Sequence, residues 1–346
     1  NFNDAITLID DYAFYQCSNL ISSDRYLLSF PDSLTRIGRY SFYKAKLITF
    51  SFGENPKLHT IDDYAFSEAT IYGNNVFDIT FPDSLITIGN HAFDQNSKVR
   101  GVIFNSKLRT IGSYAFNKNN QFSGCYKNEY YFNSNYTLII PNSVTEVGEY
   151  AFSNCSEIQY LHLSYNLQKI SNNAFYGLIK LKSNITIPDS CQSIGDFAFY
   201  DCIKASYLSI GRNVISIGES AFQNCYELKG PLVIPNSVEI IHDSAFMDCR
   251  SFNFLRLGRN VSEIHDKAFK NCIRFNSTNG LPSKLRILGN NAFDSCINMV
   301  HDLVIPDSVL NVSDYAFYNC YGLTSLKFGN KVSYIGKYAF NNCYRI

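Results

Sequence analysis

The sequence predicts a single solenoid of about 14 stacked repeats of 23 or 24 residues, each containing short parallel β-strands joined by turns. Three observations support this fold. An Ala-Phe pair recurs along the chain, and from Phe152 onward its steps are only 23 or 24 residues. Most repeats carry a short alternating apolar run that ends in Pro or Gly. A unit of this length cannot bury its own apolar face, so neighbouring repeats must stack to form a core.

One complete repeat follows Cys225. Residues 232–234 have the two-residue period of a short strand with one buried face. Pro235 ends this strand, because proline cannot donate a hydrogen bond to the sheet. Val238 and Ile241 are the expected inward anchors of a second extended segment. The Ala-Phe-x-x-Cys segment is too short for an ordinary helix and is predicted to form a turn or a 3-10 helix.

The repeats are predicted to form one array over residues 1–346. Residues 136–346 are regular, and their strands end alternately in Pro and Gly, so the larger period is 47 residues. Residues 1–135 are irregular, and one step between Phe residues reaches 36. The surplus falls in residues 117–135 and is expected to be a surface loop. Because the sequence starts and stops within the repeat pattern, we expect it to be part of a longer chain.

Composition and motifs exclude several classes of function. The 30 basic and 30 acidic residues are intermixed, without the basic stripe that nucleic-acid binding needs. No apolar run approaches the ~20 residues of a membrane span. The sequence shows no set of nucleophile and base, no paired carboxylates at a recurring position and no phosphate-binding glycine loop. We therefore expect no enzymatic activity, no cofactor and no metal.

Nine of the eleven cysteines occupy one structural position, three residues after the Phe of their repeat. They are Cys17, Cys155, Cys202, Cys225, Cys249, Cys272, Cys296, Cys320 and Cys343. Stacked cysteines ~5 Å apart fall within disulfide range. Their side chains point the same way, however, and free Cys is usually buried, so we predict reduced core thiols. Cys125, in the surplus segment, is the thiol expected to be exposed.

Two histidines, His242 and His265, replace Gly at the same position of consecutive repeats and are predicted to be stacked neighbours. Two imidazoles can begin a metal site or a pH-sensitive site. No third ligand follows at matching spacing, so we favour two solvated surface residues.

The repeat motifs resemble a known family. Ile-Pro-Asn-Ser-Val, Ile-Gly-x-x-Ala-Phe and Asn-Cys-x-x-Leu, in that order, look like the BspA-like class of leucine-rich repeats. Residues 136–346 match closely, and residues 1–135 match with drift, for example Ser41-Phe42 in place of Ala-Phe. The resemblance implies a curved, elongated solenoid on a microbial or protozoan cell surface that adheres to host proteins, matrix or other cells. It implies no catalytic residues.

Strand alternation identifies a candidate binding surface. If Leu161 and Leu163 point inward, the residues beside them point outward, and the same reasoning applies one and two 47-residue blocks later. The six candidate binding residues are Tyr160, His162, Tyr207, Ser209, Phe254 and Arg256. Tyr and Arg are frequent interface anchors. Aromatic residues also suit strands without any binding role, and that alternative stays open.

Two functional hypotheses follow. The first is a non-catalytic adhesion solenoid, on a cell surface or secreted, that binds a protein or glycoprotein ligand; six Asn-x-Ser/Thr triplets fit it. The alternative is an intracellular, cytoplasmic leucine-rich-repeat scaffold, which the many unpaired thiols fit. An enzymatic role would require a catalytic domain outside this sequence.

Overall fold

A computed structural model describes residues 2–18, 20, 28–47, 49–71, 77–96, 98–122, 136–300 and 302–346. Within these residues the chain forms a β-solenoid of about 12 turns at about 23-residue spacing, with parallel strands and no helix. The chain divides into two compact units. Unit 1 comprises residues 1–167 and 173–181, and unit 2 comprises residues 168–172 and 182–346. Cys125 and most of the surplus segment lie outside the described residues.

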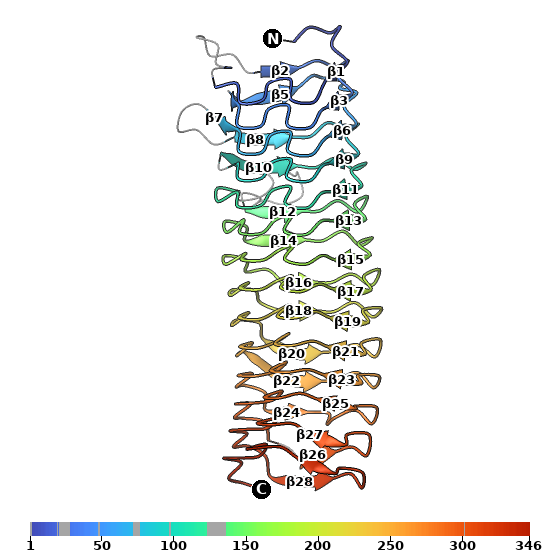
Figure 1. The fold of residues 1–346 in the computed structure, drawn as a ribbon, viewed down its shortest axis with the longest axis vertical. Coiled ribbons are helices and arrows are strands. Elements are labelled where there is room, and N and C mark those ends of the chain that lie inside the picture. The colour runs from blue at the N-terminus through green and yellow to red at the C-terminus, as the bar shows by residue number, and fades with distance from the viewer. Residues whose placement is uncertain are drawn as a thin grey trace. The chain divides into compact units, whose positions relative to one another are not determined.

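Unit 1 contains two columns of strands, side by side in Figure 1. The column on the right in Figure 1 is one six-stranded parallel sheet of two-residue strands. Its members are β1 (Leu8–Ile9), β3 (Arg36–Ile37), β6 (Thr60–Ile61), β9 (Thr87–Ile88), β11 (Thr110–Ile111) and β13 (Glu146–Val147). The remaining strands form parallel pairs. These pairs are β2 (Leu28–Phe30) with β5 (Phe50–Phe52), β4 (Lys46–Leu47) with β7 (Thr70–Ile71), β8 (Phe77–Thr80) with β10 (Val99–Ile103), and β12 (Thr137–Ile139) with β14 (Tyr160–His162).

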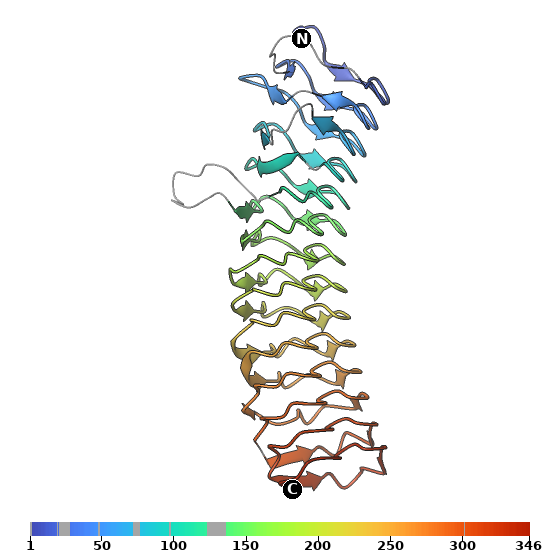
Figure 2. The ribbon, with the colours of Figure 1, turned by 90° about the vertical axis from the view of Figure 1, so that its left-hand side faces the viewer.

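Unit 2 repeats this arrangement. Its short strands are β15 (Lys169–Ile170), β17 (Ser193–Ile194), β19 (Ser216–Ile217), β21 (Ile240–Ile241), β23 (Glu263–Ile264) and β25 (Ile287–Leu288), followed by the pair β27 (Asn311–Val312) and β29 (Tyr334–Ile335). Its other column contains β16 (Ile185–Thr186) with β18 (Leu208–Ser209), β20 (Gly230–Val233) with β22 (Phe252–Arg256) and β24 (Ser277–Thr278), and β26 (Asp302–Ile305) with β28 (Ser325–Phe328). In each unit, successive turns lie one above another (Figure 2).

The repeats stack in register, as the sequence predicts. In unit 2, Ile217 pairs with Ile194 on one side and with Ile241 on the other. The Phe222 ring is fully buried and lies parallel to its neighbours, with centroids 5.5 Å from Phe199 and 5.4 Å from Phe246. Each turn therefore buries the apolar face of the next, which no single repeat can do alone.

The Ala-Phe segment forms successive β-turns. Around Phe222, the N–H groups of Ala221, Gln223 and Cys225 each donate to the carbonyl three residues back. The N–H groups between them, including that of Phe222, donate to carbonyls of the following repeat. Positive φ angles of 51° at Ser220 and 63° at Asn224 make this geometry possible. Every backbone donor of the turn is thus satisfied without a helix or strand.

The cysteines of the unit 2 column are free thiols buried between these turns, except Cys343, which is half-buried, as is Cys17 of unit 1. The Cys225 thiol donates to the carbonyl of Phe199 at 3.2 Å, and the Cys249 thiol donates to that of Phe222 at 3.1 Å. Cys155 of unit 1 makes the same bond to Phe116. The thiol is a small apolar filler that also satisfies a carbonyl of the preceding repeat.

Asn119→Cys is expected to stabilise unit 1 by about 1–3 kcal/mol, because an unsatisfied buried polar group costs that much. Asn119 takes the cysteine position of its repeat, is fully buried and has two side-chain polar atoms without a partner. A thiol there would supply the usual donor in a smaller volume. Denaturant unfolding of both proteins measures the difference. An unchanged or lower midpoint would mean that the amide is well accommodated.

Candidate interaction surface

The outward residues of β18, β20 and β22, with those immediately before them, form what we call the unit 2 strand face. It consists of Tyr207, Ser209, Pro231, Val233, Phe254 and Arg256. The residues between them point inward: Leu232 and Leu255 are at most 1% exposed. Because side chains alternate along a strand, burial of one set fixes the other set outward. Packing of the inward residues into the core therefore determines which side chains form the exposed face.

Tyr207 is held against the backbone of the next repeat. Gly230, with φ of +79°, has no side chain in the way: a Cβ there would lie 3.3 Å from the Tyr207 ring. The Lys229 ammonium lies 5.3 Å from the ring centroid, on the ring face. The ring nevertheless remains 47% exposed. Tyr207 is thus held in place before a partner binds, while nearly half of its surface stays exposed.

Phe254 and Arg256 extend the same face over β22. The register of β20 and β22 places Phe254 opposite Pro231, and Arg256 opposite Val233. Phe254 is half-buried, whereas Arg256 and Val233 are exposed. Aromatic, aliphatic and guanidinium groups therefore lie next to one another, the composition typical of interface centres.

The six predicted residues are divided between the two units. Tyr207, Ser209, Phe254 and Arg256 lie together on the unit 2 strand face, as described above. Tyr160 and His162 belong to unit 1, where β14 pairs with β12 and places them opposite Thr137 and Ile139. His162 is exposed and Tyr160 is half-buried, while Leu161 between them is only 6% exposed. Their outward direction agrees with the predicted alternation, and their role in binding stays a prediction.

Unit 1 also contains a column of stacked rings that was not predicted from the sequence, and we call it the aromatic ladder. Its members are Tyr12, Tyr40, Tyr64, His91, Tyr114 and Tyr150. Successive centroids are 4.4–5.1 Å apart and the rings lie within 10° of parallel. Burial raises the pKa of Tyr40 and of Tyr114 above its usual range. The signal available in the sequence was the aromatic residue two positions before each Phe. Because the faces cover one another, the ladder offers a partner mainly ring edges.

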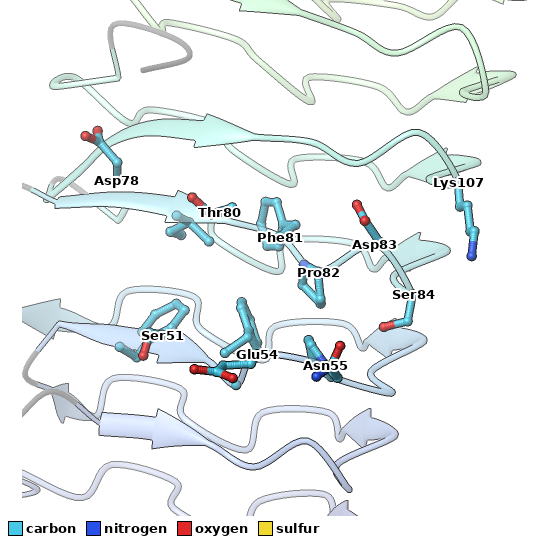
Figure 3. Close-up of a pocket in the computed structure, with 15 residues that line it drawn as sticks. Ser51, Glu54, Asn55, Asp78, Thr80, Phe81, Pro82, Asp83, Ser84 and Lys107 are labelled. Atoms are coloured by element: carbon cyan, nitrogen blue, oxygen red, sulfur yellow. The ribbon is translucent and has the colours of Figure 1, made fainter. Parts of the chain in front are cut away.

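A cleft of about 620 Å³ opens in unit 1 between the turns that carry β5 and β8. Within the described residues, β5 pairs only with β2 and β8 only with β10, so the sheet is interrupted here. In Figure 3, Ser51, Glu54 and Asn55 lie on one turn, and Thr80 and Asp83 lie on the next. The lining includes hydroxyls, carboxylates and one lysine, but neither His nor Cys.

Two further features of the lining limit its chemistry. The Asp78 carboxylate accepts a hydrogen bond from Arg100 Nε at 3.0 Å, so it is already occupied. Glu54, Asp83 and Lys107 are exposed to solvent. The cleft is thus a polar hollow at a sheet interruption, without a base oriented on a nucleophile.

His242 and His265 are neighbours, as predicted, with ring centroids 5.3 Å apart. Both are half-exposed, and His265 Nε2 lies 3.0 Å from a Glu263 carboxylate oxygen. In the described part of the chain, no three His, Cys, Asp or Glu side chains are grouped to hold a metal ion. Within the same residues, no helix has the length and apolar character needed to cross a membrane.

The chain is similar to several solved structures, and the first described here supports the fold. A leucine-rich repeat protein from Bacteroides ovatus is 22% identical, with a TM-score of 0.62 over 92% of this chain and 85% of that one. A leucine rich cell surface protein from Faecalibacterium prausnitzii is 20% identical, with a TM-score of 0.39 over 78% of this chain and 83% of its own. The pneumococcal vaccine antigen PcpA is 18% identical, with a TM-score of 0.47 over 95% and 83% of the two chains. No curated protein matches the sequence.

The repeat motif identifies the family directly. The BspA type leucine rich repeat region matches residues 1–123, 123–253 and 230–346, which together span the sequence. The in-register turns, with their Phe and Cys columns, are the structural form of those repeats. The chain therefore belongs to the BspA-type leucine-rich repeat family.

Proposed function

We propose that this chain is a non-catalytic adhesion solenoid that binds a protein or glycoprotein of a host, a matrix or another cell. The observation that carries the proposal is the unit 2 strand face, on which Phe254 and Arg256 project from β22 and Tyr207 from the position just before β18. Tyr160 and His162 form the corresponding part of unit 1. The adhesive role that the family resemblance implies supports the same function.

The face is suited to binding because it is already ordered. Tyr207 rests on the Gly230 backbone, and Phe254 lies beside Pro231. Ordering side chains on association costs ~0.5–1.5 kcal/mol for each, and this cost is reduced when the free protein already holds them. Buried aromatic or Arg anchors can each contribute ~2 kcal/mol or more. These side chains contribute little to folding when exposed, so binding and stability should separate on mutation.

We place the protein on a cell surface or outside the cell. Protease treatment and antibody labelling of intact and permeabilised cells would test this. Labelling of intact cells is expected. A signal that appears only after permeabilisation would contradict the location and favour the intracellular scaffold.

The triple variant Tyr160→Ala, Tyr207→Ala and Phe254→Ala is expected to lose attachment at least tenfold with a nearly unchanged melting temperature. Loss of ~2 kcal/mol from even one anchor corresponds to about thirtyfold in affinity. Attachment of the purified chain to host cells and to surfaces coated with matrix glycoproteins is the measurement. Tyr160→Ala alone and the Tyr207→Ala, Phe254→Ala pair separate the contributions of the two units.

The matched control is Tyr226→Ala with Tyr321→Ala. These two unit 2 residues are 37% and 39% exposed, directly follow the cysteine of their turns and belong to none of the strands that form the face. The control should attach like the wild type. Attachment that the triple variant retains, or that the control loses equally, would contradict the proposed surface. A strong loss of stability in the triple variant would mean that these rings belong to the core.

A further inference from the structure

A small pocket of about 270 Å³ lies at the edge of the unit 2 strand face. Its polar lining consists of Arg256, Arg259, Asn236, Asn279 and Ser283. Arg256 belongs both to this pocket and to the strand face. The pocket is thus a recess within the surface already proposed to bind.

The pocket exists because β24 is shorter than β22, so part of β22 has no partner strand on that side. Pairing between β22 and β24 ends at Leu255 and Thr278. Beyond that point the Asn279 side chain replaces the missing strand: its Oδ1 accepts from the Leu257 N–H at 2.9 Å, and its Nδ2 donates to the Leu257 carbonyl at 3.0 Å. Gly280, with φ of +86°, then turns away, and a Cβ there would meet nothing within 4 Å. The Asn279 side-chain amide therefore satisfies the backbone hydrogen-bonding groups of Leu257 at the sheet edge. The backbone after Asn279 turns away from that edge and leaves a recess.

The charge of the recess differs from that of the same position two repeats earlier. In the earlier repeat, Arg212 Nε lies 3.0 Å from Asp189 Oδ2, and the Arg212 N–H donates to Asp189 Oδ1 at 2.9 Å. In the pocket, Asn236 takes the place of that aspartate and accepts the Arg259 N–H at 3.0 Å. The backbone interaction is kept, but the carboxylate is gone.

The recess consequently carries positive charge without a local counter-charge. Among the described residues, neither Arg256 nor Arg259 has a carboxylate within ion-pair distance, and no acidic residue lines the pocket. Guanidinium groups bind carboxylate and sulfate oxygens through paired N–H donors. The Asn236 side-chain NH₂ and the Ser283 hydroxyl add polar groups that suit sugar hydroxyls.

We propose that this pocket binds an anionic saccharide, whose sulfate or carboxylate contacts Arg256 and Arg259. The inference rests on the proposed function and names the ligand class for one part of its surface. A single charged sugar fits a hollow of this size, and the neighbouring aromatic residues of the strand face provide apolar surface for the rest of a glycan.

The test is calorimetric titration of the purified chain with 3′-sialyllactose, sulfated lactose and neutral lactose, at low and high salt. The first two carry a carboxylate and a sulfate, so they also distinguish the two sources of charge. At least one is expected to bind ten times more tightly than lactose, and salt is expected to weaken that binding.

Asn236→Asp is the most specific variant. It gives Arg259 a carboxylate partner like the one that Asp189 provides for Arg212, and it leaves the backbone hydrogen bond in place. It should weaken binding of the anionic saccharide at least tenfold without lowering the melting temperature. The pair Arg256→Gln and Arg259→Gln should do the same. The matched control, Arg212→Gln, removes a guanidinium already paired with Asp189 and should leave binding unchanged.

Three results would overturn the inference: lactose binding as tightly as the charged sugars, equal losses for Arg212→Gln and Asn236→Asp, or tetraglutamate binding more tightly than either saccharide. Failure here is distinguishable from failure of the proposed function. One outcome is that Asn236→Asp still binds the saccharide while the Tyr207→Ala, Phe254→Ala variant loses attachment. That outcome would contradict only the saccharide pocket. If Asn236→Asp instead loses saccharide binding and the Tyr207→Ala, Phe254→Ala variant retains attachment, the adhesive strand face is contradicted and the pocket is supported.

Discussion

Phe222→Ala is expected to destabilise unit 2 by about 3–5 kcal/mol, the usual cost of removing a buried Phe ring. Phe222 is fully buried and stacks on both Phe199 and Phe246, with interplanar angles of 3° and 5°. Because the Phe222 ring lies between two turns, removing it leaves a cavity that borders both Phe199 and Phe246. Repeats couple mainly to their neighbours, so unfolding is expected to become less cooperative.

Urea unfolding followed by far-ultraviolet circular dichroism measures the change, and peptide-resolved hydrogen exchange locates it. Tyr207→Ala is the matched control, since this ring is 47% exposed in the same unit. We expect the control to stay within about 0.5 kcal/mol of the wild type. A loss below about 1 kcal/mol for Phe222→Ala would show that the ring column is not the core.

Unit 2 is also expected to lose stability steeply above about pH 8.5, the ordinary thiol pKa. Burial raises the pKa of five thiols far above that value: Cys225, Cys249, Cys272, Cys296 and Cys320. Below pH 8.5 the thiols are neutral in both the folded and the unfolded protein, so they do not affect the folding equilibrium. Above it the unfolded thiols release protons and the buried ones do not, so unfolding becomes more favourable. Each thiol contributes up to ~1.4 kcal/mol per pH unit, or about 7 kcal/mol for all five.

Melting curves between pH 7 and pH 10.5 measure this dependence. The control replaces the five cysteines with alanine, which keeps a small apolar side chain and removes the titrating group. Tyrosines and lysines titrate in both proteins, so the difference between the two slopes isolates the thiols. Equal slopes would contradict the assignment of these cysteines as buried, neutral thiols.

The features that follow from stacking were predictable from the sequence. Phe222 and Cys225 recur at fixed positions, and in a stacked array equal positions must lie on one another. The alternation of Leu161 between Tyr160 and His162 likewise assigns the inward and outward faces. Asn279 and Gly280 likewise interrupt the apolar pattern before Pro282, and β24 ends at Thr278, just before them.

Features that depend on backbone geometry were not predictable. The ring-bearing residues two positions before the unit 1 Phe residues adopt positive φ, 59° at Tyr64 and at Tyr114, although this region disfavours bulky side chains. In this conformation their rings stack into the aromatic ladder. The significance of Asn236 was equally hidden, because it depends on the ion pair between Arg212 and Asp189 at the equivalent turn.

The most direct test of the adhesive strand face is hydroxyl-radical footprinting of the chain, free and bound to a matrix glycoprotein that it attaches to. Radical oxidation reports the solvent access of individual aromatic side chains. We expect protection of Tyr207 and Phe254 on binding, while Tyr226 and Tyr321 remain as reactive as in the free chain. Protection confined to Tyr226, Tyr321 or the aromatic ladder, with Tyr207 and Phe254 unprotected, would contradict the account.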